Sequence, residues 1–225
     1  EIINILLPSI KILEIIKNVS PNSKFFQPFS SNMFGDSINK KQDELERFSP
    51  MSIYAVGKIT AYYLCQMYRK VYGLKIYGAI FYNHESEVRP EEYVTRKITK
   101  AVARIFLGKQ KKLYLGDISA KIDWGYAKDY VESAYKIMQL KKPDIFVIAS
   151  GKSYSVEYFA KKSFEYVGLN YKKYLKVDKK LLRKSKTVSL VGNTSKAKKT
   201  FNYKSKTNLN KIISLMIDND LKKES

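Results

Sequence analysis

The sequence predicts an α/β fold in which strands pair in parallel. Short runs rich in aliphatic and aromatic residues alternate with longer stretches of helical periodicity, and this alternation favours parallel strands joined by helices. Of the 225 residues, 44% are hydrophobic and 13% aromatic, which is typical of a globular protein and not of a disordered one. A chain of this length buries a sizeable core and forms one large domain or two small ones.

The first part of the chain is expected to alternate helix, strand, helix and strand. In order, these elements are a helix at 2–19, a buried strand at 25–29, a loop at 30–49, a helix at 52–72 and a strand at 76–82. Pro8 is expected to bend the first helix or to start it, because proline has no N–H and fixes φ. Gly73 follows the second helix and marks its end.

The remaining chain continues the alternation. The expected elements are a helix at 91–107, a short strand at 113–115, a helix at 126–138, a strand at 145–149, a helix at 156–167 and two terminal helices at 196–200 and 209–221. Gly108 and Gly168 close two of the helices. Asn193–Ser195 and Thr207-Asn208 offer side chains that cap the two terminal ones.

Composition excludes several classes of site. The single cysteine, Cys65, rules out an internal disulfide framework and fits a reducing compartment, so we expect a cytoplasmic protein. One Cys and one His also leave no Cys/His zinc site, and no metal is expected. No apolar run approaches the ~20 residues that cross a bilayer, so no membrane partner is expected.

The net charge of +21 raises the question of nucleic acid. The lysines are spread along the chain, with denser patches at 109–112, 171–186 and 196–206, and no nucleic-acid-binding motif accompanies them. We interpret them as a lysine-rich solvated surface and expect no nucleic-acid partner. An anionic substrate would still benefit from a positive field.

Tyr54 and Lys58 form the most informative chemical pattern. Four residues apart, they lie one turn apart on one face of the helix at 52–72. A lysine ammonium beside a phenol favours the phenolate, which accepts a proton from a substrate alcohol near neutral pH. Taken alone, the same spacing is also that of a solvated helix face, so its meaning depends on the surroundings.

Those surroundings resemble the GDP-mannose 4,6-dehydratases, a family of extended short-chain dehydrogenase/reductases. The resemblance runs from about residue 11 to residue 221. It is carried by Ser52–Lys58 (SIYAVGK), Asn83–Ser86 (NHES), Val94–Ile98 (VTRKI), Asp123–Gly125 (DWG), Ala127–Val131 (AKDYV) and Val147–Ala149 (VIA), in the family's order.

The resemblance implies the C-terminal half of a Rossmann-like parallel sheet joined to a small α/β substrate-binding lobe. Residues 1–85 correspond to the remainder of the NAD(P)-binding domain, and residues 86–225 mostly to the lobe, with some segments returning to the first domain. In the family, a glycine-rich turn that holds the cofactor pyrophosphate precedes this region. No G-x-G-x-x-G pattern occurs in this sequence, so we expect that the chain begins inside a domain.

The resemblance also implies catalytic roles. NADP accepts hydride from sugar C4, a base takes the C5 proton while water leaves C6, and hydride returns to C6. Tyr54 and Lys58 serve the first step, and Ser30 matches the residue that hydrogen-bonds the reacting oxygen. Asn32 stands where the family has its glutamate base, and an amide has no titratable proton near neutral pH. The elimination is therefore expected to be impaired.

Other positions match binding residues of the family. Tyr54, Lys58, His84 and Arg89 match cofactor positions, and Arg89 belongs to a loop that reaches the neighbouring subunit in the family. Asn83, Lys97 and Arg183 match nucleotide-sugar contacts. Departures from the family pattern are Val88 for an arginine, Ile122 for an arginine, Tyr126 for a histidine and Lys186 for a glutamate. His84 and the DWG motif each have a packing interpretation as well, the latter as a turn into the following helix.

Three other functions stay open. Without the glutamate, the site could act as a GDP-sugar epimerase or reductase of the same superfamily. A non-catalytic paralogue that binds an active partner is the second alternative, and a nucleic-acid binder is the third. For the leading interpretation, the expected partners are a GDP-sugar, NADP and further copies of the chain in a homo-oligomer, either a dimer or a tetramer.

Overall fold

The computed structural model describes residues 2–182 and 189–225 and divides the chain into two compact units. Unit 1 comprises Glu1–Tyr82, Tyr130–Gly151 and Leu190–Lys204, and unit 2 comprises Asn83–Asp129, Lys152–Ser189 and Ser205–Ser225. Parallel pairing of strands within each unit confirms the predicted α/β class. Among the described residues, no helix is both long and apolar enough to span a bilayer.

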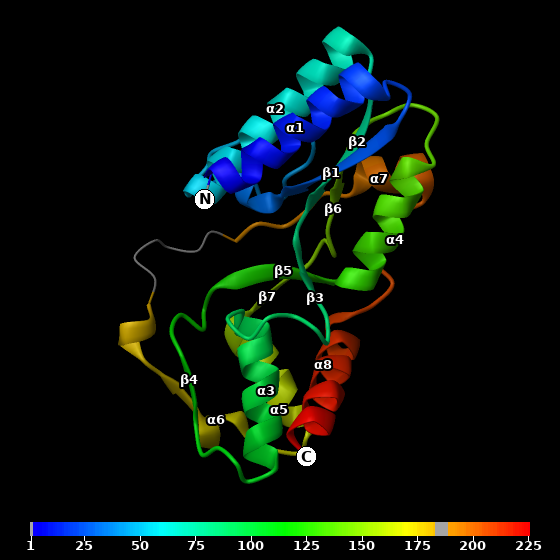
Figure 1. Ribbon diagram of the computed structural model, residues 1–225. Coiled ribbons are helices and arrows are strands. Elements are labelled where there is room, and N and C mark those ends of the chain that lie inside the picture. Colours follow the sequence, from blue (N-terminus) through cyan, green and yellow to red (C-terminus); the bar gives the residue numbers. More distant parts are fainter. Residues whose placement is uncertain (1, 183–188) are drawn as a thin grey trace. The chain divides into compact units, whose positions relative to one another are not determined.

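Unit 1 is built on a three-stranded parallel sheet of order β1-β2-β6 (Figure 1). Its strands are β1 (Lys24–Ser30), β2 (Lys75–Phe81) and β6 (Ile145–Ile148). Side chains alternate across a strand, so β2 sends Ile76 and Ile80 to one face and Tyr77 and Ala79 to the other. Both faces are therefore buried, as expected for a parallel sheet.

Helices cover both faces of this sheet. On one side α1 (Ile2–Val19) and α2 (Ile53–Tyr72) pack on the sheet, and on the other side lie α7 (Ser195–Phe201) and the part of α4 (Ala127–Met138) that belongs to unit 1. Figure 1 shows α1 and α2 side by side. Pro8 lies inside α1, which begins at Ile2, so the expectation that Pro8 starts the helix is wrong. Leu13 and Ile16, buried beyond the proline, hold that half of α1 in the core.

Local signals define the ends of α2. The Ser52 hydroxyl accepts a hydrogen bond from the backbone N–H of Ala55 at 3.1 Å, which satisfies one of the free donors of the first turn. Gly73 adopts the left-handed conformation (φ 66°), and its N–H bonds to the Arg69 carbonyl. These two residues confirm the helix predicted at 52–72.

Unit 2 contains two small sheets. In the first, β5 (Lys121–Tyr126) pairs in parallel with β3 (Asn83–Glu85) and antiparallel with β7 (Ser153–Ser155). In the second, β4 (Leu113–Leu115) pairs in parallel with β8 (Leu175–Val177).

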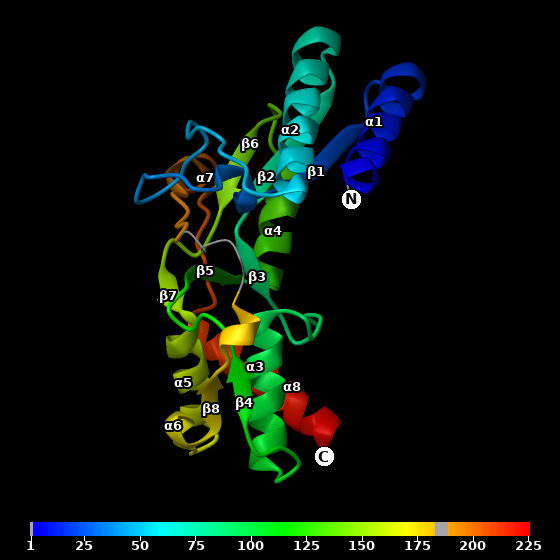
Figure 2. The ribbon, with the colours of Figure 1, turned by 90° about the vertical axis from the view of Figure 1, so that its left-hand side faces the viewer.

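Three helices pack around the core of unit 2, as Figure 2 shows. They are α3 (Val94–Phe106), α5 (Val156–Tyr166) and α8 (Leu209–Glu224). The buried Trp124 of β5 contacts the Phe159 ring at 5.2 Å between centroids, which ties the first sheet to α5. Short helical segments α6 (Tyr171–Tyr174) and η2 (Lys179–Leu181) precede and follow β8.

Several sequence expectations need correction. The DWG motif lies in β5 and is not a turn, and the following helix begins at Ala127 and not at Tyr126. Strands β3, β5, β7 and β8 were not expected. The loop predicted at 30–49 contains a 3₁₀ turn, η1 (Ser31–Phe34). Asn208 caps α8 as expected. At the start of α7, Thr194 makes no side-chain cap, but the predicted Asn193 accepts a hydrogen bond from the backbone N–H of Ser195 at 3.1 Å.

Candidate active site

Helix α2 presents Tyr54 and Lys58 from unit 1. Its buried side includes Gly57, where an added Cβ would lie 3.3 Å from Ile5 of α1, so the helices approach closely there. Tyr54 and Lys58 are only partly buried. The helix is thus anchored by its apolar residues, while the phenol and the ammonium stay at the margin of the core.

The Lys58 ammonium links α2 to the end of β1. Its Nζ donates a hydrogen bond to the Pro28 carbonyl at 3.0 Å and lies 5.8 Å from the centroid of the Tyr54 ring. Burial lowers the pKa of Lys58, because desolvation disfavours its charged form. A cation so placed lies over the face of the Tyr54 ring, within the range of a cation–π contact.

Ser30 ends β1 two residues after Pro28. Its Oγ accepts a hydrogen bond from the backbone N–H of Asn32 at 3.2 Å and so caps η1. A hydroxyl that accepts one bond still has a proton to donate, so Ser30 retains a donor for a substrate oxygen. The Asn32 side chain is exposed at the start of the same turn.

Gly35 fixes the chain just after η1. Its φ is +54°, and a Cβ built there would lie 1.4 Å from the Ser49 carbonyl oxygen, so only glycine fits. The Ser49 N–H bonds in turn to the Met33 carbonyl at 3.0 Å. The turn that carries Asn32 is therefore held by backbone packing against the segment before α2.

Unit 2 carries the residues of the NHES motif and the loop after it. Asn83 is exposed and His84 partly buried in β3. Glu85 is 2% exposed, and its Oε2 accepts a hydrogen bond from the Thr95 hydroxyl at 2.6 Å and lies 3.3 Å from Arg89 Nε. Burial raises the pKa of Glu85, and Arg89 and Thr95 oppose that shift.

Arg89 is held from a second side. Its Cζ lies 3.5 Å from the centroid of the Tyr93 ring, so the guanidinium stacks on an aromatic face while Nε turns to Glu85. The neighbouring position, Val88, is 80% exposed. Where the family has a histidine, the Tyr126 hydroxyl donates to the Glu87 carboxylate, with Oε1 at 3.0 Å and Oε2 at 3.2 Å.

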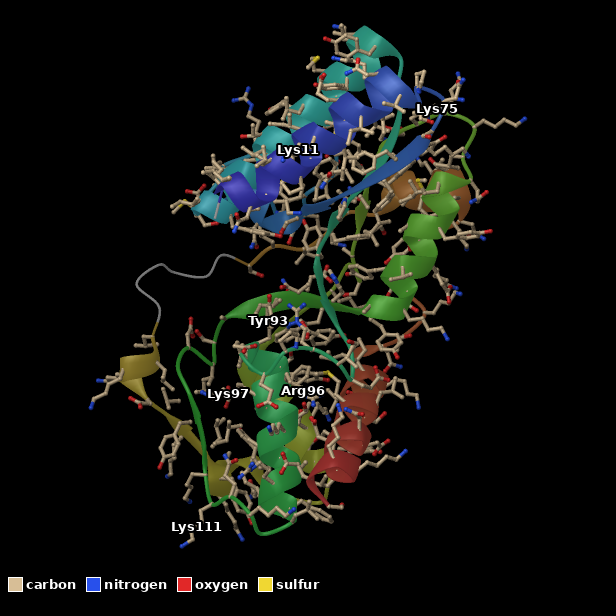
Figure 3. All side chains as sticks on the ribbon, in the orientation of Figure 1. Lys11, Lys75, Tyr93, Arg96, Lys97 and Lys111 are labelled. Atoms are coloured by element: carbon tan, nitrogen blue, oxygen red, sulfur yellow. The ribbon has the colours of Figure 1, made fainter. Side chains whose placement is uncertain are left out.

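The predicted site residues are divided between the two units. Ser30, Asn32, Tyr54 and Lys58 belong to unit 1, and Asn83, His84, Arg89 and Lys97 belong to unit 2. Lys97 is exposed on α3, whereas the preceding Arg96 is buried (Figure 3). Arg183, with Lys186, lies outside the described residues.

Sequence reasoning missed four partners of these groups. Pro28 acts through its carbonyl, which no side-chain pattern reveals. Glu85 and Tyr93 hold Arg89, and Thr95 holds Glu85. The four-residue spacing from Glu85 to Arg89 and from Arg89 to Tyr93 was an available signal. Among the described residues, no group of three or more His, Cys, Asp or Glu side chains is arranged to hold a metal ion.

Solved structures with this fold are numerous. The RMD structure from Pseudomonas aeruginosa, complexed with NADPH, superposes with a TM-score of 0.89 at 16% identity over 97% of this chain and 73% of that one. The dTDP-glucose 4,6-dehydratase of Bacillus anthracis, in complex with NAD, gives 0.85 at 18% identity over 98% and 68%. At such low identities these likenesses establish the fold alone.

A sequence model of the family described as GDP-mannose 4,6 dehydratase matches residues 2–216. The chain belongs to the GDP-mannose 4,6-dehydratase family. Relatives include GDP-mannose 4,6 dehydratase 1 of Arabidopsis thaliana, 41% identical over 95% of this chain and 60% of the relative. The human GDP-mannose 4,6 dehydratase is 34% identical over 96% of this chain and 62% of its own length. The chain thus spans about three-fifths of the length of these family members.

Proposed function

We propose that this chain acts as a GDP-mannose 4,6-dehydratase, which converts GDP-mannose to GDP-4-keto-6-deoxymannose with NADP. The observation that carries the proposal is the position of Lys58, whose ammonium lies beside the Tyr54 ring and bonds to the Pro28 carbonyl near Ser30. This arrangement gathers a base, a cation and a hydroxyl donor in one unit of a family member.

These residues fit the nicotinamide end of NADP. A partly buried ammonium supplies donors for ribose hydroxyls, and the Tyr54 ring lies beside that ammonium. NADP, when bound, supplies the acceptor for the C4 hydride and returns that hydride to C6. Tyr54 takes the proton from the C4 hydroxyl, Lys58 stabilises the phenolate, and Ser30 donates a hydrogen bond to the same oxygen.

The second step depends on a proton carrier that Asn32 does not provide. Removal of the C5 proton calls for a base, and an amide has no suitable pKa. Positioned acid–base groups accelerate such steps by ~10²–10⁴-fold. The chain should therefore eliminate water more slowly than relatives that carry a carboxylate at this position.

Unit 1 is assigned to the cofactor, and unit 2 to the nucleotide sugar and to part of the cofactor contact. Asn83, Lys97 and Arg183 are assigned to the GDP-sugar, and His84 and Arg89 to NADP. Since Nε of Arg89 faces Glu85, only its terminal nitrogens are left for a cofactor phosphate. We assign the working protein to the cytoplasm, as a homodimer or homotetramer.

The test is formation of a 4-keto-6-deoxy product from GDP-mannose and NADP, followed by mass spectrometry. Tyr54→Phe should lower the rate by ~10²–10⁴-fold, whereas Tyr63→Phe, at an exposed tyrosine of the same helix, should leave it unchanged. Asn32→Glu should raise it by a similar order. Equal rates for Tyr54→Phe and Tyr63→Phe would contradict the assignment of the base.

Asn32 itself favours a second candidate, a GDP-sugar epimerase or reductase that oxidises C4 without elimination. The two reactions differ at C5, because only the dehydratase must break the C5–H bond. Incubation in deuterium oxide distinguishes them: deuterium at C5 of the sugar supports the dehydratase, and exchange confined to other positions supports the alternative.

A further inference from the structure

Unit 2 contains a cleft between α3 and β4 whose lining is strongly cationic. Its volume is about 380 Å³, and four of its lining residues are Lys97, Lys100, Arg104 and Lys112. Among the described residues, Glu91 is the only carboxylate that lines the cleft, which leaves a net charge of +3. Glu224 lies 3.6 Å from both Lys100 and Arg104, and counting it still leaves +2.

The cations are arranged in a row and not as a single cluster. Lys97, Lys100 and Arg104 follow one another at helical spacing along one face of α3, over about 10 Å of helix axis. Lys112 lies on the other wall, immediately before β4. A row of cations is complementary to an extended polyanion, and lysine and arginine are the usual ligands of phosphate oxygens.

Hydrogen bonds hold two of these walls in place. Lys112 Nζ donates to the Lys173 carbonyl at 2.6 Å, and the Gln110 amide donates to the Lys112 carbonyl at 2.7 Å. Lys100 Nζ bonds to Glu91 at 2.6 Å. An ammonium has three donors, so Lys112 and Lys100 each keep donors for a ligand.

Tyr114 adds an aromatic surface to the cleft. It lines the cleft beside Lys112 and is 52% exposed, and its register partner in β8 is Lys176. An exposed tyrosine face next to phosphate ligands suits a base that stacks on it. The cleft therefore has room and chemistry for a phosphate chain and, next to it, for a ring.

We propose that this cleft binds a linear polyphosphate group, carried by a nucleoside triphosphate or present as inorganic polyphosphate. The inference shares Lys97 with the proposed function but does not depend on the dehydratase reaction. Arg104, Lys112 and Tyr114 are the new binding residues.

The experiment is calorimetric titration of the chain with sodium tripolyphosphate and, separately, with GTP, at two salt concentrations. Arg104→Gln and Lys112→Gln should each weaken tripolyphosphate binding at least fivefold and reduce its salt dependence, because each removes a charged contact. The controls are Lys111→Gln, next to the cleft but not in its lining, and Lys11→Gln on α1 (Figure 3). Both should bind within twofold of the unchanged chain.

Tyr114→Ala separates the two sources of phosphate. Weaker GTP binding with unchanged tripolyphosphate binding identifies a nucleotide, and equal effects on both identify inorganic polyphosphate. The proposal is overturned if Arg104→Gln and Lys112→Gln bind tripolyphosphate as the controls do, in variants that melt at the same temperature. Binding of a single-stranded oligonucleotide but not of tripolyphosphate would also overturn it. If the unchanged chain bound tripolyphosphate but had no dehydratase activity, only the proposed function would be contradicted.

Discussion

The two units hold their functional charges in opposite ways. In unit 1, Lys58 is partly buried, and its ammonium donates a hydrogen bond to the neutral backbone carbonyl of Pro28. In unit 2, two buried carboxylates each face an arginine: Glu85 faces Arg89, and Asp220 pairs with Arg96 at 2.7 Å between Oδ1 and Nη2. Desolvation alone accounts for the lowered pKa of Lys58, whereas an opposite charge offsets the effect of desolvation on the pKa of Glu85 in unit 2.

The presence or absence of a counter-ion decides whether burial shifts a pKa or fixes the position of a side chain. Burial without a counter-ion changes the pKa of a lysine, which suits a residue that must respond to a neighbouring phenol. Burial with a counter-ion fixes a position, and Arg96 and Glu85 fix the two ends of the loop between β3 and α3. Four predictions follow from the contrast, and each can break it.

The largest effect is expected for Arg96→Met. Arg96 and Asp220 have side chains only 6% and 1% exposed, so removing the guanidinium leaves a buried carboxylate without its counter-ion. Such a loss costs about 3–5 kcal/mol of unfolding free energy. Urea unfolding followed by the fluorescence of Trp124, the single tryptophan and a core residue of unit 2, measures it.

Two variants control for this effect. Lys162→Ala breaks an exposed pair, Lys162–Glu165, and should cost far less stability than Arg96→Met. The double variant Arg96→Met/Asp220→Leu removes both charges and should recover most of the lost stability. A cost for Arg96→Met as small as that of Lys162→Ala would show that the buried pair does not stabilise unit 2.

The second prediction concerns Gly35 in unit 1. Gly35→Ala forces an L-residue into positive φ, at about 1–2 kcal/mol, and also drives a Cβ into the Ser49 carbonyl, so we expect about 3 kcal/mol in all. Gly73 also has positive φ, but a Cβ there meets nothing within 4 Å, and Gly73→Ala should show only the first cost.

Chemical labelling of the single cysteine measures how readily unit 1 opens in each of these variants. Cys65 is fully buried, and burial raises its pKa to about 12, so at pH 8 its thiol reacts only when the unit opens. Gly35→Ala should accelerate the labelling far more than Gly73→Ala. Equal acceleration by the two variants would mean that the close approach to Ser49 is not a constraint.

The outcome of sequence prediction follows the same contrast. The ends of α2 were predictable because Ser52 and Gly73 are local signals, and the apolar runs of β2 and β6 identified the sheet of unit 1. The three-residue strands β3, β7 and β8 carry no pattern of their own and form only through pairing with distant segments. The interleaved units were likewise not marked by glycine- or proline-rich linkers.

For the site, sequence reasoning supplied residue types but not their surroundings. The resemblance located Tyr54, Lys58 and Ser30, and the structure places Lys58 against a backbone atom that has no signature in the sequence. Arg89 was predicted as a cofactor contact, and its orientation depends on the burial of Glu85, which a linear sequence does not reveal. Its cofactor role stays a prediction.

The third prediction uses pH. The folded-state pKa of Glu85 is raised above 4.5, so just above that pH the folded state keeps a proton that the unfolded state has lost. Stability should therefore fall as pH rises through this window. Glu85→Gln should reduce the fall, which Asp220, also raised by burial, would partly maintain.

Lys58 should give the opposite sign. Its folded-state pKa lies below 10.5, so in the window beneath that value the unfolded state binds more protons, and stability rises with pH. Lys58→Met should remove this rise and leave the acidic limb unchanged. Urea midpoints across both ranges test the pair, and a change in the acidic limb with Lys58→Met would break the contrast.

The smallest effects are expected for two tyrosine hydroxyls. In unit 1 the Tyr77 hydroxyl donates to the Leu140 carbonyl at 2.9 Å from a side chain that is 1% exposed, and in unit 2 Tyr126 donates to the Glu87 carboxylate nearer the surface. Tyr77→Phe should cost about 1 kcal/mol, since it leaves a partly buried carbonyl unpaired. Tyr126→Phe should cost only a few tenths of the cost of Tyr77→Phe, because a water molecule replaces the phenol hydroxyl as the donor to Glu87. If the charged acceptor made Tyr126→Phe the more costly change in urea unfolding, charge and not burial would govern these bonds, and the distinction between the units would have to be redrawn.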